Sequence, residues 1–313
     1  MTDQLNKYLF ADQLTRAQTV ELTDAWQTGL KHQHYPDCVR NLLGELTAAA
    51  VLLAGNLKLD GSLILQAQGD GPIALMVVEC TSEFAIRATV SLRENVEIPT
   101  DGNLQNLLNT YDNGKFIVVL EPKAGGDLTP YQGIVPLEGD TLAQVLENYM
   151  KHSEQLDTKI YLSANAEKAH GLLLQRLPGT GGYIEGMNAP DEPSWERAQQ
   201  LATTIKSEEL LAVPTAELIH RLFWQEDLMR LEPATVQWHC PCTRERVGNM
   251  LHMLGREEIE SILTEQENIE VSCNFCGKPY LFDAVDSAQL FIAKSNQPEA
   301  NSSSQLHLVV STT

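Results

Sequence analysis

Cys240-Pro241-Cys242 and Cys273-Asn274-Phe275-Cys276-Gly277 are the two stretches that decide the fold at the C-terminal end of this chain. Zinc prefers four ligands in a tetrahedron, and two cysteines separated by one or two residues can aim both sulfurs at one ion. Gly277 suits the tight turn after the second pair, because glycine tolerates a positive φ. The two stretches therefore predict a zinc ion held by Cys240, Cys242, Cys273 and Cys276.

The residues around these cysteines predict a small domain over 233–294. Thr243 can cap a helix that ends at Gly255, and 256–265 predict a second short helix. Strands are expected at 269–271 and 280–282. A module of this size has little core, so metal binding would supply much of its folding free energy, on the order of 10 kcal/mol. The low-complexity tail, 295–313, is expected to be flexible.

Several interpretations of the cysteines stay open from the residues alone. The second pair also fits a thioredoxin-type redox pair, although this leaves Cys240 and Cys242 without a role. A purely structural zinc clip fits equally, and His239 could replace one cysteine as a ligand. Each pair could also form a disulfide once zinc leaves, which makes a reversible switch chemically feasible. Cys38 and Cys80 lie far apart in the sequence and are expected to be small buried hydrophobic residues.

The composition excludes several classes of protein. The chain has 313 residues, of which 43% are hydrophobic, so it is globular and large enough for one sizeable core plus smaller modules. Its net charge is −20, and acidic residues outnumber basic ones in every predicted region, which argues against nucleic acids and anionic membranes as partners. No signal peptide is recognisable, so a cytoplasmic location is expected, where thiols stay reduced.

Residues 1–182 predict an α+β core domain rather than a doubly wound sheet. Helices are expected at 38–53 and 141–155, each with an apolar stripe. Strands are expected in a consecutive group with the helices at its sides. They fall at 61–68, 73–80, 84–92, 116–120, 159–163 and 171–177. The run Pro178–Gly182 then predicts a domain boundary.

Residues 183–232 predict a mainly helical linker region. Residues 194–206 are amphipathic, and Pro214-Thr215 can start another helix that carries apolar residues as far as Met229. One interpretation is two ordinary helices packed on a neighbour; the other is that they dock only conditionally, since they are acidic and have no evident strand partner.

The sequence shows no Walker A loop, no His-Glu-x-x-His motif and no nucleophile with a base, so an enzyme is not predicted.

Short stretches over most of the chain resemble one known family, the redox-regulated, zinc-binding heat-shock chaperones of about thirty-three kilodaltons, or heat-shock thirty-three family. Each stretch is weak alone, but their order, followed by Cys-x-Cys, a long gap and Cys-x-x-Cys, is highly specific. The stretches include Asp3–Leu5, Tyr8–Phe10, His34–Pro36, Leu43–Leu46, Leu65–Pro72, Tyr131–Val135, Leu137–Asp140, Gly171–Gln175 and Glu208–Leu211.

This resemblance implies a holdase chaperone that needs no ATP. The reduced, zinc-bound protein would be an inactive monomer. Oxidation would join Cys240 to Cys242 and Cys273 to Cys276, release zinc, and unfold the C-terminal domain. The linker would then loosen and expose apolar surface to unfolding client proteins, often in a homodimer. The alternatives are a dithiol oxidoreductase that uses Cys273 and Cys276, and a structural zinc-ribbon scaffold.

Overall fold

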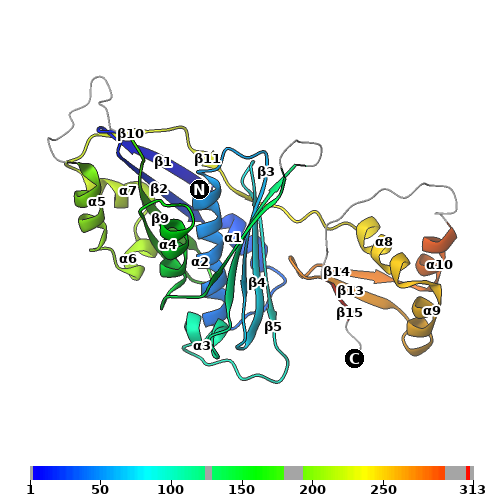
Figure 1. Cartoon of the computed structure of the whole chain (residues 1–313). Coiled ribbons are helices and arrows are strands. Elements are labelled where there is room, and N and C mark those ends of the chain that lie inside the picture. Colours follow the sequence, from blue (N-terminus) through cyan, green and yellow to red (C-terminus); the bar gives the residue numbers. More distant parts are fainter. Residues whose placement is uncertain (1–2, 124–128, 180–192, 293–307, 311–313) are drawn as a thin grey trace. The chain divides into compact units, whose positions relative to one another are not determined.

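Two sheets and the helices around them make up most of the computed structural model, which describes residues 3–123, 129–179, 193–292 and 308–310 (Figure 1). The chain divides into two units. The first comprises Met1–Leu30 and His34–His239, and the second comprises Lys31–Gln33 and Cys240–Thr313. The mixed α+β class predicted from the sequence is confirmed.

The first sheet of the first unit is antiparallel and brings the two ends of that unit together. Its order is β10-β1-β2-β9-β8, and β11 also pairs with β1. Strands from residues 4–22 therefore lie beside strands from residues 158–176 and from 228–235. The bounds are β1 Gln4–Phe10, β2 Thr15–Leu22, β8 Thr158–Ala164, β9 Ala169–Arg176, β10 Leu228–Arg230 and β11 Ala234–Thr235.

The second sheet has the order β12-β5-β4-β3-β6-β7, in which β3, β4 and β5 form consecutive hairpins and β6 and β7 form another that pairs with β3. Only β12 is parallel to its neighbour, β5. The predicted strands at 61–68, 73–80, 84–92 and 116–120 are confirmed within a few residues. The bounds are β3 Gly61–Gln68, β4 Ile73–Thr81, β5 Ala85–Leu92, β6 Lys115–Pro122, β7 Tyr131–Pro136 and β12 Gln237–Trp238.

The helix α2 (Asp37–Ala54) contacts both sheets and forms the centre of the core. Nearly every residue from Leu42 to Leu53 is buried, since the helix meets β2, β8 and β9 on one side and β3, β4 and β5 on the other. The sequence predicted this helix and also α4 (Leu142–His152), which Thr141 caps and which packs on β8. Two short helices, α1 (Asp24–Leu30) and α3 (Leu104–Leu108), complete the unit's core.

Three helices cover the face of the first sheet that α2 leaves free: α5 (Ser194–Ala202), α6 (Ser207–Ala212) and α7 (Thr215–Phe223) (Figure 1). Successive residues of β9 point to opposite faces, so Leu173 joins the core around α2 while Leu172 joins a second core under the helices. The partners of this second core are Tyr8, Phe10, Ala17, Leu174, Trp195, Ala198, Ala202, Ile219 and Phe223.

The expected helix through Met229 is wrong. It ends at Phe223, and Met229 lies in β10, opposite Leu9 of β1. The expectation that residues 183–232 have no strand partner is wrong for the same reason. The edge of β1 supplies the hydrogen-bonding partners for β10. This partner lies far away in the sequence, so the spacing of apolar residues around Met229 could not predict it. The helix α6 was not predicted.

The second unit places three helices around a small sheet of order β14-β13-β15. The two predicted helices and the two predicted strands are confirmed. The helix α10 was not predicted, nor was β15, the apolar Leu308–Val310, which pairs with β13. The bounds are α8 Arg244–Leu254, α9 Arg256–Glu265, α10 Ala284–Ile292, β13 Ile269–Cys273, β14 Pro279–Phe282 and β15 Leu308–Val310. Most of the predicted boundary at Pro178–Gly182 and of the flexible tail lies outside the described residues.

Candidate metal centre

Two local structures position the four cysteines of the second unit. Cys240 and Cys242 lie directly before α8, whose first turn is capped by Thr243: its Oγ1 accepts a hydrogen bond of 3.2 Å from the N–H of Arg246. Cys273 ends β13, and Cys276 lies in the turn to β14. That turn is closed by a 2.7 Å hydrogen bond from the N–H of Gly277, which has a φ of +65°, to the carbonyl of Cys273.

The four sulfur atoms meet at one point. All four lie within 4.8 Å of one another. Sγ of Cys240 is 3.7 Å from Sγ of Cys273, and Sγ of Cys242 is 3.4 Å from Sγ of Cys276. Four sulfurs at about 2.3 Å from a tetrahedral zinc ion would be about 3.8 Å apart. The observed spacing therefore fits a single four-coordinate metal ion.

Backbone N–H groups also point at these sulfurs. The N–H of Cys242 faces the sulfur of Cys240, those of Phe275 and Cys276 face Cys273, and that of Lys278 faces Cys276. A hydrogen bond to a charged sulfur favours the thiolate over the thiol. The surrounding backbone is therefore arranged for negatively charged sulfur, which is the form that binds metals.

The thiols compete for charge when they have only one another as partners. Hydrogen bonds from Cys240 and Cys276 lower the pKa of Cys273, and the contact with Cys273 raises the pKa of Cys240. Four thiolates this close repel one another, so they cannot all ionise without a nearby positive charge. A metal cation would remove this conflict.

Tyr280 contacts the centre directly, and Arg244 packs on the strand that carries Tyr280; the sequence analysis did not identify either as functional. The hydroxyl of Tyr280 donates to Sγ of Cys242 at 3.1 Å and lies 3.0 Å from the carbonyl of the same residue. Arg244 packs over the ring of Phe282 at 4.3 Å and donates to the carbonyl of Leu281 at 2.6 Å. The alternation along β14, with Tyr280 and Phe282 buried and Leu281 exposed, is the signal that could have placed Tyr280 on the cysteine side.

The remaining candidate residues lie elsewhere. Among the described residues, the group able to share one ion consists of the four cysteines and does not include His239. The backbone N–H of His239 donates to the carbonyl of Ile86. Cys80 is fully buried, as predicted, and burial raises its pKa to about 12. Cys38 is only half-buried, and its thiol donates to the carbonyl of Pro99 at 3.2 Å.

Comparison with known proteins confirms the resemblance seen in the sequence. The model of the family described as Hsp33 protein matches residues 3–283. The 33 kDa chaperonin of Methylobacillus flagellatus is 42% identical over 299 residues, which cover 95% of this chain and 97% of that protein. The 33 kDa chaperonin of Chromobacterium violaceum is 45% identical, covering 92% of this chain and 94% of its own.

A solved structure shows the same fold. The crystal structure of the 33 kDa chaperonin of Thermotoga maritima, a heat shock protein 33 homolog, matches with a TM-score of 0.76 at 23% identity. The match covers 94% of this chain and 99% of that one. Together with the family model and the relatives above 40% identity, it leads to one conclusion: this chain belongs to the Hsp33 family.

Proposed function

We propose that this protein is a redox-regulated holdase chaperone that binds unfolding proteins without ATP once its metal-binding cysteines are oxidised. Family membership, with relatives named chaperonins, supports a chaperone rather than an enzyme. The observation that carries the regulatory part is the convergence of four sulfur atoms within 4.8 Å. Four thiols in one small unit provide both a metal site and the means to destroy it.

The metal that suits this site is zinc, because four thiolates at tetrahedral spacing are a common structural zinc site. Bound zinc would crosslink Cys240, Cys242, Cys273 and Cys276 and offset their charge. The unit depends on such a crosslink, since its buried core is small and Cys273 is itself part of it. The other members of that core are Val247, Leu251, Ile259, Ile269, Val271, Tyr280 and Phe282.

Oxidation would remove all four ligands. Each pair of thiolates would form one S–S bond and pass two electrons to a peroxide, which takes two protons from solvent and is reduced to water, while the zinc ion is released. The resemblance implies Cys240–Cys242 and Cys273–Cys276 pairing, and we propose that pairing here. Sulfur–sulfur hydrogen bonds of 3.7 and 3.4 Å, however, join Cys240 to Cys273 and Cys242 to Cys276. All partners are within reach, so peptide mapping of the oxidised protein decides between them.

The linker, residues 183–232, is the element that would respond. Its described helices pack on the first sheet through strongly apolar side chains of their own. Trp195 and Phe223 are buried in this contact, and Ile205 and Leu222 are half-buried. Short helices of this length are not stable alone in water. Their release would expose this apolar surface, which is a binding site for non-native proteins.

Polar contacts also hold the linker helices on the first sheet. At the start of α5, the carboxylate of Asp12 accepts from the N–H of Ser194 at 2.8 Å and from its hydroxyl at 2.9 Å. Nδ1 of the buried His170 lies 2.8 Å from the carbonyl of Leu210 in α6. Both contacts bridge a core strand or turn and a linker helix, so they are lost when the linker leaves.

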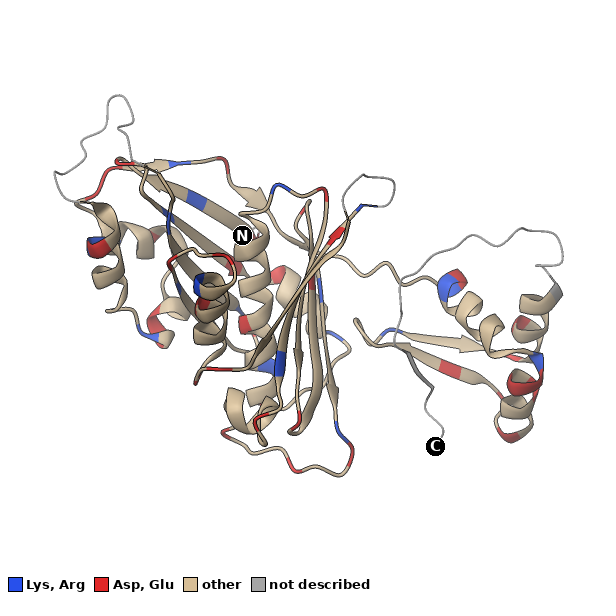
Figure 2. Ribbon diagram, viewed as in Figure 1, with Lys and Arg blue, Asp and Glu red and all other residues tan. Residues whose placement is uncertain are grey.

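The same proposal includes the partners and location. Unfolding or aggregating proteins would be the clients, and the protein would be a monomer when reduced and a homodimer when oxidised, in the cytoplasm. Lys and Arg residues are scattered among Asp and Glu over the described ribbon, which does not favour nucleic acid (Figure 2). Among the described residues, no helix has the length and apolar character needed to cross a membrane.

A light-scattering assay with a thermally unfolding client tests the proposal. Peroxide with mild heat should switch on suppression of aggregation, and reductant with zinc should switch it off. Cys38→Ser is the matched control, because it removes a half-buried thiol outside the cluster and should leave the switch intact. Equal suppression by the reduced, zinc-loaded and the oxidised protein would show that the chaperone is not regulated by its thiols.

A further inference from the structure

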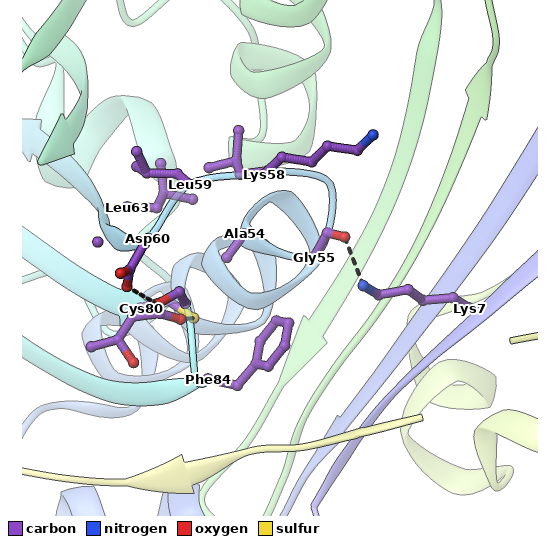
Figure 3. Close-up of a pocket in the computed structure, with 13 residues that line it drawn as sticks. Lys7, Ala54, Gly55, Lys58, Leu59, Asp60, Leu63, Cys80 and Phe84 are labelled. Carbon is purple, nitrogen blue, oxygen red and sulfur yellow. Dashed lines mark hydrogen bonds between the residues drawn. The ribbon is translucent and has the colours of Figure 1, made fainter. Parts of the chain in front are cut away.

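A pocket of about 350 Å³ opens in the first unit, beside the C-terminal end of α2 (Figure 3). It lies between the loop that leads into β3 and the turn from β4 to β5, with Lys7 of β1 entering from the side. This volume is within the range of small-molecule sites, roughly 300–1,000 Å³. The pocket is separate from the cysteines of the metal centre and has no role in the redox mechanism.

The charge in this pocket is unusual for such an acidic protein. Nζ of Lys7 donates to the carbonyl of Gly55 at 2.8 Å and lies 5.6 Å from the centre of the Phe84 ring. Burial, and to a lesser extent the nearby Arg16, lowers the pKa of Lys7. Although the chain has 42 acidic residues, neither Lys7 nor Arg16 forms an ion pair within the described structure.

A half-buried ammonium without a carboxylate partner favours a bound anion. Lys7 has two N–H bonds left after the one to Gly55, which is enough for the two oxygens of a single carboxylate. Besides Lys7, the lining contains one further cation, Lys58, and one acid, Asp60. Asp60 would repel a dianion such as phosphate more strongly than a monocarboxylate, so a monocarboxylate is better suited. The Asp60 carboxylate is itself held by the hydroxyl of Ser82 at 3.5 Å and by Lys123 at 3.9 Å.

Much of the remaining lining is apolar, apart from the polar side chains of Lys58, Thr81 and Ser82, and it includes an aromatic residue with an unusual backbone conformation. Phe84 has a φ of +58°, a left-handed conformation that is rare for a bulky side chain and is often found where a ligand is held. Cys80 is at the pocket wall, but burial raises its pKa to about 12, so its thiol is a poor nucleophile and a non-covalent ligand is favoured. The other apolar members are Ala54, Leu57, Leu59 and Leu63.

We propose that this pocket binds an organic monocarboxylate with an apolar chain, its carboxylate paired with Lys7 and its chain against Phe84 and the leucines. The acid can be free or the C-terminal end of a peptide, since both present the same group. This proposal does not depend on the redox function, because no residue of the pocket takes part in the thiol chemistry.

Calorimetric titration of the full-length reduced, zinc-loaded protein tests it. Octanoate should bind saturably with one site per chain, and octanol, which has the same chain without the charge, should bind much more weakly. Lys7→Met should weaken octanoate binding roughly tenfold or more, because it removes a charged hydrogen bond. Lys7→Arg should retain binding, and Lys115→Met, an exposed lysine on β6, should leave it unchanged.

Two further measurements separate ligand loss from misfolding and identify the source of the acid. Phe84→Gly removes the ring at a φ that glycine tolerates, so it should fold normally, as judged by circular dichroism, and bind octanoate less tightly. N-acetyl-Leu-Leu with a free carboxylate, compared with its amide, shows whether peptide ends are accepted as well as free acids. Equal affinity for octanoate and octanol, or full octanoate affinity in a folded Lys7→Met variant, overturns the proposal.

Discussion

In the proposed zinc site, each of the four sulfurs would be one ligand, so a substitution of any one cysteine should have a strong effect. Cys240→Ser, Cys242→Ser, Cys273→Ser and Cys276→Ser should each lower zinc affinity sharply, because each removes one of four bonds. Zinc content after dialysis against a chelator measures this. The double variant of Cys273 and Cys276 should retain no zinc; full occupancy in it would refute a four-cysteine site.

The hydroxyl of Tyr280 should matter for the same centre, although it is not a ligand. It donates to the sulfur of Cys242, and losing a partner of this kind typically lowers metal affinity roughly 10–100-fold. Tyr280→Phe should therefore release zinc to a competing chelator more readily while the buried ring keeps the fold. Tyr111→Phe, at an exposed position, is the control and should behave like the unmodified protein. Unchanged zinc affinity in Tyr280→Phe would remove this role.

The buried His170 makes the linker contact sensitive to pH. Burial lowers its pKa below the ordinary 6.5, outweighing Glu21, whose carboxylate is 3.9 Å from Nε2. Between these two pKa values the unfolded chain binds more protons than the folded one, so the free energy of unfolding should fall as pH drops below about 6.5. Urea unfolding of the first unit should show this slope. His170→Asn, whose amide can replace Nδ1–H, should lose it, while exposed His152→Asn should keep it.

Among the elements, α7 offers a matched pair of adjacent residues. Phe223 is buried against Phe10, with ring centres 5.3 Å apart, whereas Trp224 is 68% exposed. Phe223→Ala should weaken docking of the helix by about 3–5 kcal/mol and expose the linker to protease without oxidation. Trp224→Ala should leave protection nearly unchanged. If both variants are cut equally slowly, packing of α7 does not hold the linker.

The helices and strands show which parts of the fold could be predicted from the sequence. Local periodicity predicted α2, α4, α8 and α9, and cysteine spacing predicted the metal ligands, because these signals lie within a few turns of chain. The short strand β10 was missed, since its partner among the described strands is β1, more than two hundred residues earlier. The contact of His170 with Leu210 was missed for the same reason. It joins a side chain to a distant backbone carbonyl, and such a contact produces no recognisable pattern of residues in the sequence.

At the scale of the whole molecule, zinc binding and linker protection should change together. Oxidation should turn residues 193–232 from protease-resistant to readily cut, because the chain reaches Cys240 directly after β12, the last strand of the first unit. Mass mapping of the fragments, together with zinc release followed by a chelating dye, measures both events. Linker cleavage that is equally fast before and after oxidation would separate the two and contradict the coupling.

The position of β1 adds a consequence of linker release. Within the described sheet, one side of β1 pairs with β2, and its other side pairs only with β10 and β11, which lie just after the linker helices. If these two short strands detach with the helices, the outer main-chain N–H and C=O groups of Gln4–Phe10 are left without partners. An open strand edge accepts any extended polypeptide through its backbone, whatever the side chains. The freed protein would then offer unfolding chains a template for strand addition, and such a surface would not depend on the side chains of the client.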